Sequence, residues 1–217
     1  MPPKTIKTSF ATLAAELVRA PRRHSTMLLG IDGGGGAGKS TFARSLQAAL
    51  APLVGHVTLV QMDDFFLPSP QQRPAKDDFV DGKIAWQRLR DQVLSPLKAE
   101  QPGCYQRYDW PSHTLQEWHT VDVGGILIVE GIRALRRELA PLYDHRIWVE
   151  CPRSARLSRG IARDGEVARA RWELDWMPAE DRYIREHQPR EVADLVVDGS
   201  GQSGTDTSQF FIAVTAR

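Results

Sequence analysis

A run of glycines directly after a short apolar segment constrains this chain more than any other feature. Residues 26–32 read Thr-Met-Leu-Leu-Gly-Ile-Asp, which is typical of a buried strand, and residues 33–41 read Gly-Gly-Gly-Gly-Ala-Gly-Lys-Ser-Thr. We expect a helix from about Ser40 to Leu50, which ends before Pro52. Strand, glycine loop and helix in this order match the pattern of a phosphate-binding loop, Gly-x-x-x-x-Gly-Lys-Ser/Thr.

Each residue type in this loop has a physical reason. Glycines adopt positive φ and let the backbone approach phosphate oxygens. Their N–H groups and the positive end of the following helix attract anions. Lys39 is expected to bind the β- and γ-phosphates of ATP, and the Ser40 hydroxyl to ligate Mg²⁺. The loop residues that we predict to bind ATP are Gly33, Gly34, Gly35, Gly36, Ala37, Gly38, Lys39, Ser40 and Thr41.

Three other interpretations of the loop fit less well. A flexible linker needs neither Lys39-Ser40 nor a preceding apolar strand. A dinucleotide site would use the Gly-x-Gly-x-x-Gly spacing that the glycine run also contains, but a Lys-Ser pair directly after the last glycine favours the phosphate-binding loop. A GTPase normally carries an Asn-Lys-x-Asp motif, and the sequence has none.

The bulk properties are those of an ordinary globular protein. The 217 residues suit a single domain, 1–217, and the net charge of +1 gives no global field for nucleic acid or an anionic membrane. We therefore expect a small-molecule substrate, no nucleic-acid partner and no membrane partner, and leave a homo-oligomer open. Cys104 and Cys151 lie in no metal-ligand pattern. Without a membrane-spanning run or an apolar signal-peptide core, the expected location is cytoplasmic.

Apolar strand patterns alternate with helical periodicity along the chain, which predicts an α/β fold with a mostly parallel sheet. Helical spacing of apolar residues predicts a lead-in helix over about 5–20. Cys104 to Trp110 reads as an edge strand, whereas the tail 209–216 is apolar without a clear period. The further strands are expected at 57–62, 125–129, 145–150 and 194–198, and the further helices at 84–98, at 153–163 and up to about 187.

Acidic residues follow two of these strands. Asp63 and Asp64 come directly after the second strand, at the edge where open α/β sheets bind ligands. One of them is expected to take a proton from an acceptor hydroxyl or to help hold Mg²⁺. Glu130 ends the strand at 125–129, where many phosphate-loop proteins place an acid that reaches Mg²⁺. Capping of a turn by the aspartates, and simple solvation of Glu130, are the structural alternatives.

Arginines cluster after residue 153. Arg156, Arg159 and Arg163 are spaced i, i+3, i+7, so they share one helix face and repel one another unless an anion binds there. Arg169 and Arg171 follow, in a segment predicted to form a lid. Such arginines can close over ATP and stabilise the transferring charge. A solvated basic face is the alternative, with ion pairs to Asp164, Glu166 and Glu173.

Several segments resemble, in the same order, motifs of the uridine kinase/phosphoribulokinase-like family of P-loop kinases. The resemblance runs from about Leu28 to Asp198. It implies a three-layer P-loop fold, a five-stranded sheet of order 2-3-1-4-5 and a short lid over about 163–176. Besides the glycine loop, the matching segments are Met62-Asp63-Asp64-Phe65-Phe66, Tyr108-Asp109-Trp110-Pro111-Ser112-His113, Val129-Glu130-Gly131-Ile132, Arg156-Leu157-Ser158-Arg159 with Arg163-Asp164, and Ala193-Asp194-Leu195-Val196-Val197.

The resemblance also implies a reaction, in which the γ-phosphoryl group of ATP is transferred to the 5′-hydroxyl of uridine or cytidine. It puts the base on Asp63 rather than Asp64. The residues to which it and the spacing assign roles are Lys39, Asp63 and Arg163 in catalysis, Arg159 and Arg169 in ATP binding, Ser40, Glu130 and Asp63 at the metal, and Asp81, Tyr108 and His113 at the acceptor.

Two departures from the family pattern leave the acceptor open. Gly160 stands where the family has a second arginine, and residues 78–82 only loosely match its ribose-binding segment. A kinase of the same branch that acts on pantothenate, glycerate or another polyol is therefore an alternative. An inactive nucleotide-binding regulator is a further one, against which the intact Lys39, Ser40, Asp63 and Glu130 argue.

Overall fold

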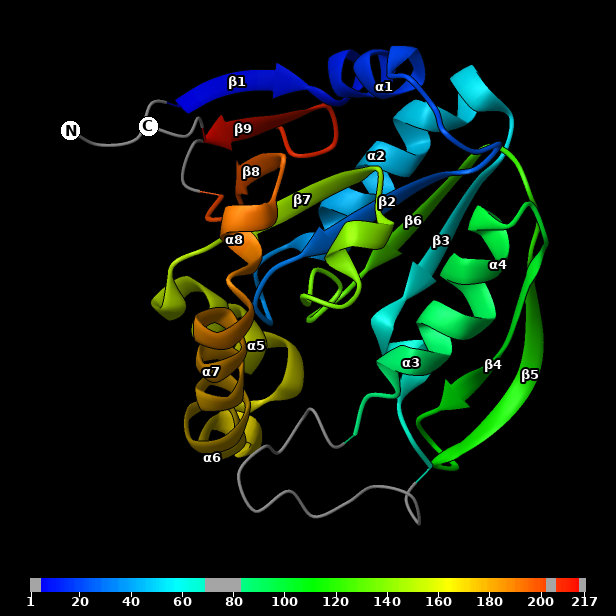
Figure 1. Ribbon diagram of the computed structural model, residues 1–217. Helices are drawn as coiled ribbons and strands as arrows, with labels where there is room; N and C mark the ends of the chain where they lie inside the picture. Colours follow the sequence, from blue (N-terminus) through cyan, green and yellow to red (C-terminus); the bar gives the residue numbers. More distant parts are fainter. Residues whose placement is uncertain (1–4, 69–82, 202–205, 215–217) are drawn as a thin grey trace.

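A seven-stranded sheet forms the centre of the molecule in the computed structural model, which describes residues 5–68, 83–201 and 206–214 (Figure 1). The strands follow the order β1-β9-β8-β7-β2-β6-β3. The five strands from β8 to β3 are parallel to one another and have the expected order 2-3-1-4-5. The strands of this sheet are β1 (Thr5–Ser9), β2 (Met27–Asp32), β3 (Val57–Gln61), β6 (Ile126–Glu130), β7 (His145–Glu150), β8 (Leu195–Asp198) and β9 (Phe210–Val214).

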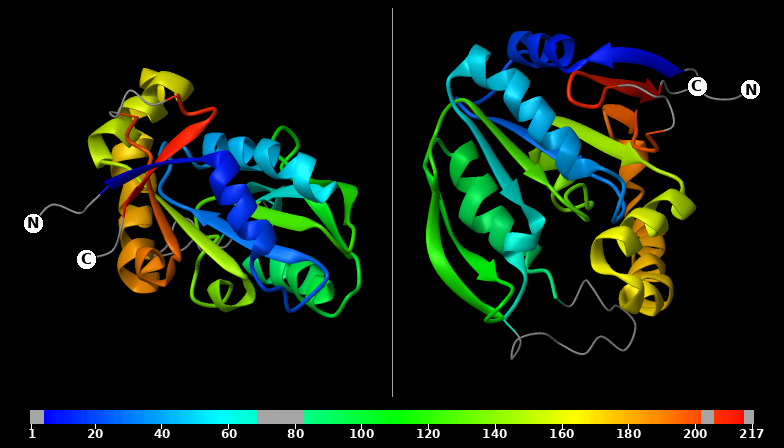
Figure 2. Two further views of the ribbon diagram at one scale, coloured as in Figure 1. Left: turned by 90° about the horizontal axis from the view of Figure 1, so that it is seen from above. Right: turned by 180° about the vertical axis from the view of Figure 1, so that it is seen from behind.

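Helices cover both faces of the sheet, which confirms the three-layer α/β fold. In the view from behind, α2 lies in front of the sheet with α1 above it (Figure 2). On the other face, α3 and α4 join through a π-helical turn, Arg90–Leu94, into one helix that confirms the prediction for 84–98. The helices are α1 (Phe10–Arg19), α2 (Lys39–Val54), α3 (Trp86–Leu89), α4 (Ser95–Lys98), α5 (Arg153–Asp164), α6 (Arg169–Arg171), α7 (Met177–His187) and α8 (Pro189–Val192). None of the described helices is long and apolar enough to cross a membrane.

The central strands show why their sequences are apolar without interruption. On β2, Leu29 and Ile31 pack into the core under α1 and α2, whereas Leu28 packs into the core under α3 and α4. All six residues of β2 are buried. A parallel strand covered on both faces needs apolar side chains in both directions, so the alternation that marks a half-exposed strand is missing.

The N-terminal prediction was wrong in part, because residues 5–9 form β1 instead of the first turns of a helix. β1 pairs antiparallel with β9, and β9 pairs antiparallel with β8, so the sheet has seven strands rather than five. The helix begins only at Phe10, where the Ser9 side chain accepts the Thr12 N–H at 3.0 Å. A short polar strand whose partner lies at the other end of the chain leaves no local signal.

Two further expectations need correction. The strand at 104–110 is β4 (Gly103–Asp109), but it is no edge of the main sheet: it forms a separate hairpin with β5 (Thr114–Val121) that packs beside α3 and α4. Helix α2 also continues to Val54 through Pro52. A proline in the last turn removes one helical hydrogen bond, which a helix end tolerates more easily than a helix centre.

Candidate active site

The glycine loop joins β2 to α2 and has the backbone shape that its sequence predicts. Gly36 and Gly38 have φ of 75° and 99°, in the left-handed region that side chains rarely adopt. A Cβ atom at Gly36 would lie 2.5 Å from the carbonyl oxygen of Arg156, so α5 lies directly against the loop. No side chain caps the first turn of α2, whose N–H groups therefore suit an anion.

Lys39 is held in the loop by the backbone. Its ammonium donates to the carbonyl oxygen of Gly34 at 3.0 Å, and the residue is buried. The next residue, Ser40, donates its hydroxyl to Oε1 of Glu130 at 2.9 Å. This bond places the end of β6 beside the start of α2, and brings together two of the three residues that the sequence assigned to Mg²⁺.

The loop is also bound by two buried carboxylates that the sequence analysis missed, and one of them, Glu180, lines the same cavity as Lys39. Gly33 donates its N–H to Oδ1 of Asp32 at 2.6 Å, and Gly35 donates to Oε1 of Glu180 at 3.0 Å. Glu180 also accepts Nη1 of Arg156 at 2.5 Å. Asp32 directly precedes the glycines and could have been suspected, whereas nothing in the sequence near Glu180, on α7, indicates this contact.

Asp63 and Asp64 point to different surroundings. Asp63 lines the large cavity beside the loop, whereas Asp64 accepts the Tyr105 hydroxyl at 3.0 Å and forms an ion pair with Arg107 at 3.1 Å. Burial raises the pKa of Asp63; the charge of Lys39 opposes this rise and that of Glu130 adds to it. A carboxylate with a raised pKa that faces a cavity is a better proton acceptor than an ordinary aspartate.

The residues predicted to bind the phosphates and those predicted to bind the acceptor line one cavity of about 910 Å³. Its wall on the hairpin side is aromatic. The ring centroids of Phe66 and Trp110 are 4.7 Å apart, those of Tyr108 and Trp110 are 5.2 Å apart, and the Tyr108 hydroxyl is bonded to Nδ1 of His113 at 2.8 Å. The residues of the cavity to which the sequence analysis gave a role or attention include Gly35, Gly36, Gly38, Lys39, Ser40, Thr41, Asp63, Tyr108, Trp110, His113, Glu130, Arg159, Gly160, Arg163 and Arg171.

The three arginines that were expected to act together on one face of α5 have separate partners. Arg156 is buried and forms an ion pair with the buried Glu180. Arg159 donates to the carbonyl oxygens of Gly36, Gly199 and Ser200 at 3.2, 2.6 and 2.6 Å. Arg163 lines the large cavity and pairs with Asp164 at 2.7 Å. Long side chains that start on one helix face thus reach three different neighbours.

Beyond the glycine loop, one residue with an assigned role does not line the cavity, and another lies outside the described residues. Arg169 pairs with Glu166 and Glu173 on the surface and does not line the cavity, whereas Arg171 does, with its guanidinium 5.6 Å from the ring centroid of Trp176. Glu166 and Glu173 lie three and four positions from Arg169, so they are close enough on the helix surface to pair with its guanidinium. Asp81 lies outside the described residues.

Trp172 explains why Gly160 departs from the family pattern. A Cβ atom at Gly160 would lie 2.4 Å from Cε2 of Trp172, so no side chain fits there while the indole is in place. The indole N–H donates to Asp164 at 2.9 Å, and the ring also lies against Gly35 of the loop. A tryptophan from the segment after α6 therefore fills the space next to the loop.

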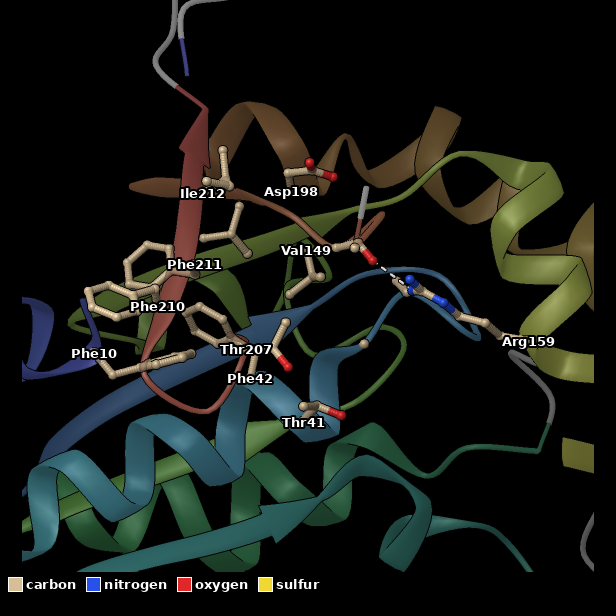
Figure 3. Close-up of a pocket in the computed structure, with 15 residues that line it drawn as sticks. Phe10, Thr41, Phe42, Val149, Arg159, Asp198, Thr207, Phe210, Phe211 and Ile212 are labelled. Carbon is tan, nitrogen blue, oxygen red and sulfur yellow. Dashed lines mark hydrogen bonds between the residues drawn. The ribbon is translucent and has the colours of Figure 1, made fainter. Parts of the chain in front are cut away.

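A smaller cavity of about 250 Å³ adjoins the other side of the loop (Figure 3). Phe10 on α1 and Phe211 on β9 line it, so the predicted lead-in helix and a strand that the sequence did not predict build part of its wall. Thr41 and Arg159 line both cavities, and the figure shows the hydrogen bond that Arg159 donates to the carbonyl oxygen of Gly199. The two cavities therefore meet at the glycine loop.

The comparisons with known proteins point to one family. The model of the phosphoribulokinase/uridine kinase family matches residues 28–197. Mouse uridine-cytidine kinase-like 1 is 32% identical over 193 residues, which are 81% of this chain and 34% of the mouse protein, so the chain spans about a third of that relative. The uridine kinase of Halobacterium salinarum is 30% identical over 171 residues, 74% of this chain and 71% of the relative.

Solved structures show the same fold. A structure from Bacillus stearothermophilus, described as a possible uridine kinase, has a TM-score of 0.67 and 23% identity, and the match covers 86% of this chain and 96% of the other. At this identity the likeness concerns the arrangement of strands and helices.

Proposed function

We propose that this chain transfers the γ-phosphoryl group of ATP to the 5′-hydroxyl of uridine or cytidine. The chain belongs to the phosphoribulokinase/uridine kinase family and is therefore a phosphotransferase with a hydroxyl acceptor. One observation carries this proposal. The glycine loop, the cavity-facing Asp63 and the aromatic wall around Tyr108 open into a single cavity, so a phosphate donor and an aromatic acceptor can meet there.

The donor is proposed to lie across the two cavities. The adenine of ATP would occupy the smaller cavity, between the phenylalanines and Arg159, and the phosphates would follow the loop to Lys39. The shared residues Gly38 and Thr41 support this path. Lys39 and the N–H groups at the start of α2 would bind the β- and γ-phosphates, as in other phosphate-binding loops.

A magnesium ion fits the oxygen ligands beside Lys39. Ser40 and Glu130 supply a hydroxyl and a carboxylate 2.9 Å apart, with Asp63 on the same cavity, and Mg²⁺ is usually bound by one or two such groups plus the phosphates. Among the described residues no three His, Cys, Asp or Glu side chains form a cage of their own, which agrees with an ion held jointly with the nucleotide. When bound, Mg²⁺ offsets the charge of the phosphates.

The transfer step needs one base and one cation from the chain. In this proposal Asp63 accepts the proton of the acceptor hydroxyl while that oxygen bonds to the γ-phosphorus and the bridging oxygen leaves with ADP. Arg163, on the same cavity, faces the oxygens of the migrating group and stabilises their charge. The raised pKa of Asp63 keeps it a capable base once it is ionised.

The acceptor base is proposed to stack against the aromatic wall. Phe66, Tyr108 and Trp110 present rings to the cavity, and His113 is fixed by its bond to the Tyr108 hydroxyl. Stacking on such rings is sequence-tolerant among bases, so hydrogen bonds from His113 would supply the preference for a pyrimidine. The family resemblance assigns the ribose hydroxyls to Asp81.

An acceptor screen with the purified protein tests the proposal. Coupled measurement of ADP release with Mg·ATP should show stimulation by uridine or cytidine and none by adenosine. Glycerate and pantothenate complete the panel. Stimulation by neither pyrimidine nucleoside would reject the nucleoside assignment while leaving the kinase assignment to the other acceptors.

One observation favours an acidic polyol as the second candidate. Lys83 and Arg171 both line the cavity, and the pKa of Lys83 is lowered by partial burial and by the charge of Arg171. Two cations near each other suit an acceptor that carries a carboxylate, such as glycerate or pantothenate. Stimulation of ADP release by one of these acids, and by no nucleoside, would establish this candidate.

A further inference from the structure

We propose that α7 is a positioning element for the phosphate loop, in which Glu180 and Tyr183 fix the loop, Glu180 directly and Tyr183 through Asp32. The inference rests on the proposed binding of ATP phosphates to this loop. Neither residue lies in a motif of the sequence, and both reach the loop from a helix more than 140 positions further along the chain.

Glu180 and Lys39 bind the two ends of one peptide group. The N–H of Gly35 donates to Oε1 of Glu180 at 3.0 Å, and the carbonyl oxygen of Gly34, in the same peptide plane, accepts the ammonium of Lys39 at 3.0 Å. A peptide group is planar and rigid, so fixing its N–H also fixes the direction of its carbonyl. The orientation of Lys39, which is proposed to contact the phosphates, therefore depends on Glu180.

Glu180 is itself held in place by burial and charge. It is 3% exposed and accepts Nη1 of Arg156, which is 6% exposed, at 2.5 Å. A Cβ atom at Gly35 would lie 2.8 Å from Oε1, so the carboxylate touches the loop backbone without intervening atoms. The arginine neutralises the buried carboxylate, and the second oxygen remains for the loop.

Tyr183 lies one helical turn after Glu180 and acts on the loop through Asp32. Oδ1 of Asp32 accepts the N–H groups of Gly33 and Arg133 at 2.6 and 3.1 Å. Oδ2 accepts the N–H of Leu135 at 2.9 Å and the Tyr183 hydroxyl at 2.5 Å. All four partners donate, so they favour the ionised carboxylate and oppose the rise in its pKa that burial causes.

The arrangement links the loop to the strand end that carries Glu130. Asp32 joins the first glycine of the loop to the residues after β6, and Tyr183 ties that junction to α7. Because Glu180 binds Gly35 and Tyr183 acts on Gly33 through Asp32, α7 holds the loop at two places. The direction of the loop N–H groups that remain for a ligand thus depends on α7, a helix that is not part of the phosphate-loop motif.

Binding of Mg·ATP and of adenosine, measured by calorimetry well below the unfolding temperature, tests the proposal without an acceptor. Glu180→Ala should weaken Mg·ATP about tenfold or more, and Glu180→Gln about threefold, because its amide oxygen still accepts from Gly35. Tyr183→Phe should weaken Mg·ATP about three- to tenfold. Adenosine, which has no phosphates, should bind all three variants as it binds the wild type.

Two matched controls separate loop contact from general packing. Asp181→Asn removes the neighbouring α7 carboxylate, which pairs with Arg153 of α5 at 2.9 Å on the surface and not with the loop. Tyr143→Phe removes another buried tyrosine hydroxyl close to Asp32, one without a hydrogen-bond partner among the described residues. Both controls should keep wild-type affinity for Mg·ATP.

Wild-type Mg·ATP affinity in Glu180→Ala and Tyr183→Phe would overturn the proposal, and so would an equal loss of ATP and adenosine affinity. Equal losses in the two controls would also overturn it, because the effect would then belong to the packing of α7. If Glu180→Ala does not fold, the Mg·ATP affinities of Glu180→Gln and Tyr183→Phe test the proposal. A wild-type protein that binds no Mg·ATP would instead reject the proposed function on which the inference rests.

Discussion

The phosphate loop and the aromatic acceptor wall face the same cavity, but they are held in different ways. The loop is fixed mainly through its backbone: Gly33 and Gly35 donate to buried carboxylates, and Gly34 and Gly36 accept from Lys39 and Arg159. The wall is made of side chains from the β4–β5 hairpin and of Phe66 in the segment after β3, and they contact one another by ring packing and one hydroxyl–imidazole bond.

This difference separates two kinds of specificity. Backbone N–H groups recognise phosphate regardless of what carries it, so changes at the loop should affect transfer to every acceptor. Side chains on the wall recognise shape and hydrogen-bonding groups, so changes there should alter which acceptor is used. Trp110 is 50% exposed and Tyr108 is 2% exposed, so the wall has both an exposed part and a buried part.

The largest effect is expected from Lys39→Ala, on the loop side of the comparison. It removes the charge proposed to bind the β- and γ-phosphates and the contact with the Gly34 carbonyl. We expect kcat to fall about a thousandfold with any acceptor, measured as ADP release at saturating substrates. Lys98→Ala, on α4 away from both cavities, is the control. Retained turnover would show that the loop does not bind the transferring phosphates.

The next largest effect is expected from Asp63→Asn, at the border between loop and wall. Loss of the proton acceptor should lower kcat about a hundredfold and leave the affinity for Mg·ATP nearly unchanged. Asp64→Asn should do less, because Asp64 is engaged by Tyr105 and Arg107 in the hairpin. A larger loss of kcat in Asp64→Asn than in Asp63→Asn would move the base to Asp64.

The pH dependence of kcat gives an independent reading of Asp63. The base must be ionised, and burial raises the pKa of Asp63, so activity should fall as the pH decreases through this raised value. The acidic limb of the profile should therefore lie above the ordinary aspartate range. The residual activity of Asp63→Asn should lack this limb; an unchanged limb would assign it to another group.

The same comparison explains what the sequence could predict. The loop, α2 and the acids at the ends of β3 and β6 are contiguous motifs, and each has the expected place in the fold. Their geometry follows from local rules: glycine at positive φ, a helix start and two parallel strand ends at one edge. The parallel strand order also agrees with the family resemblance.

The parts that were not predicted depend on contacts between distant residues. Glu180 meets Gly35 across 145 positions, and β1 pairs with β9 from the opposite end of the chain. Arg169 and Arg171 have the same chemistry two positions apart, yet only Arg171 faces the cavity because two glutamates hold Arg169. The spacing of arginines in the sequence indicates that a cation is available near the site, but it does not indicate which carboxylate each arginine will pair with.

A moderate effect is expected on the wall side from Tyr108→Phe and His113→Ala. Each removes one partner of the 2.8 Å bond between the Tyr108 hydroxyl and Nδ1 of His113. The KM for the nucleoside should rise about tenfold, which corresponds to the loss of one partly buried hydrogen bond, while the KM for ATP stays unchanged. His119→Ala, whose ring stacks on Tyr105 and does not line the cavity, is the control. A parallel rise in the KM for ATP would mean that loop and wall are not separable.

The smallest effect is expected at the junction of the two regions, where Trp172 lies between Gly160 and Gly35. Gly160→Ala gains about 1 kcal/mol of helix propensity but forces the indole away, which costs about 1–3 kcal/mol. The net loss of about 1 kcal/mol should lower the unfolding temperature by about 2–4 °C. In a Trp172→Leu background, where the ring is gone, the same glycine-to-alanine change should be neutral or stabilising. If Gly160→Ala destabilises both backgrounds equally, the indole is not what excludes a side chain at Gly160, and the departure from the family pattern has another cause.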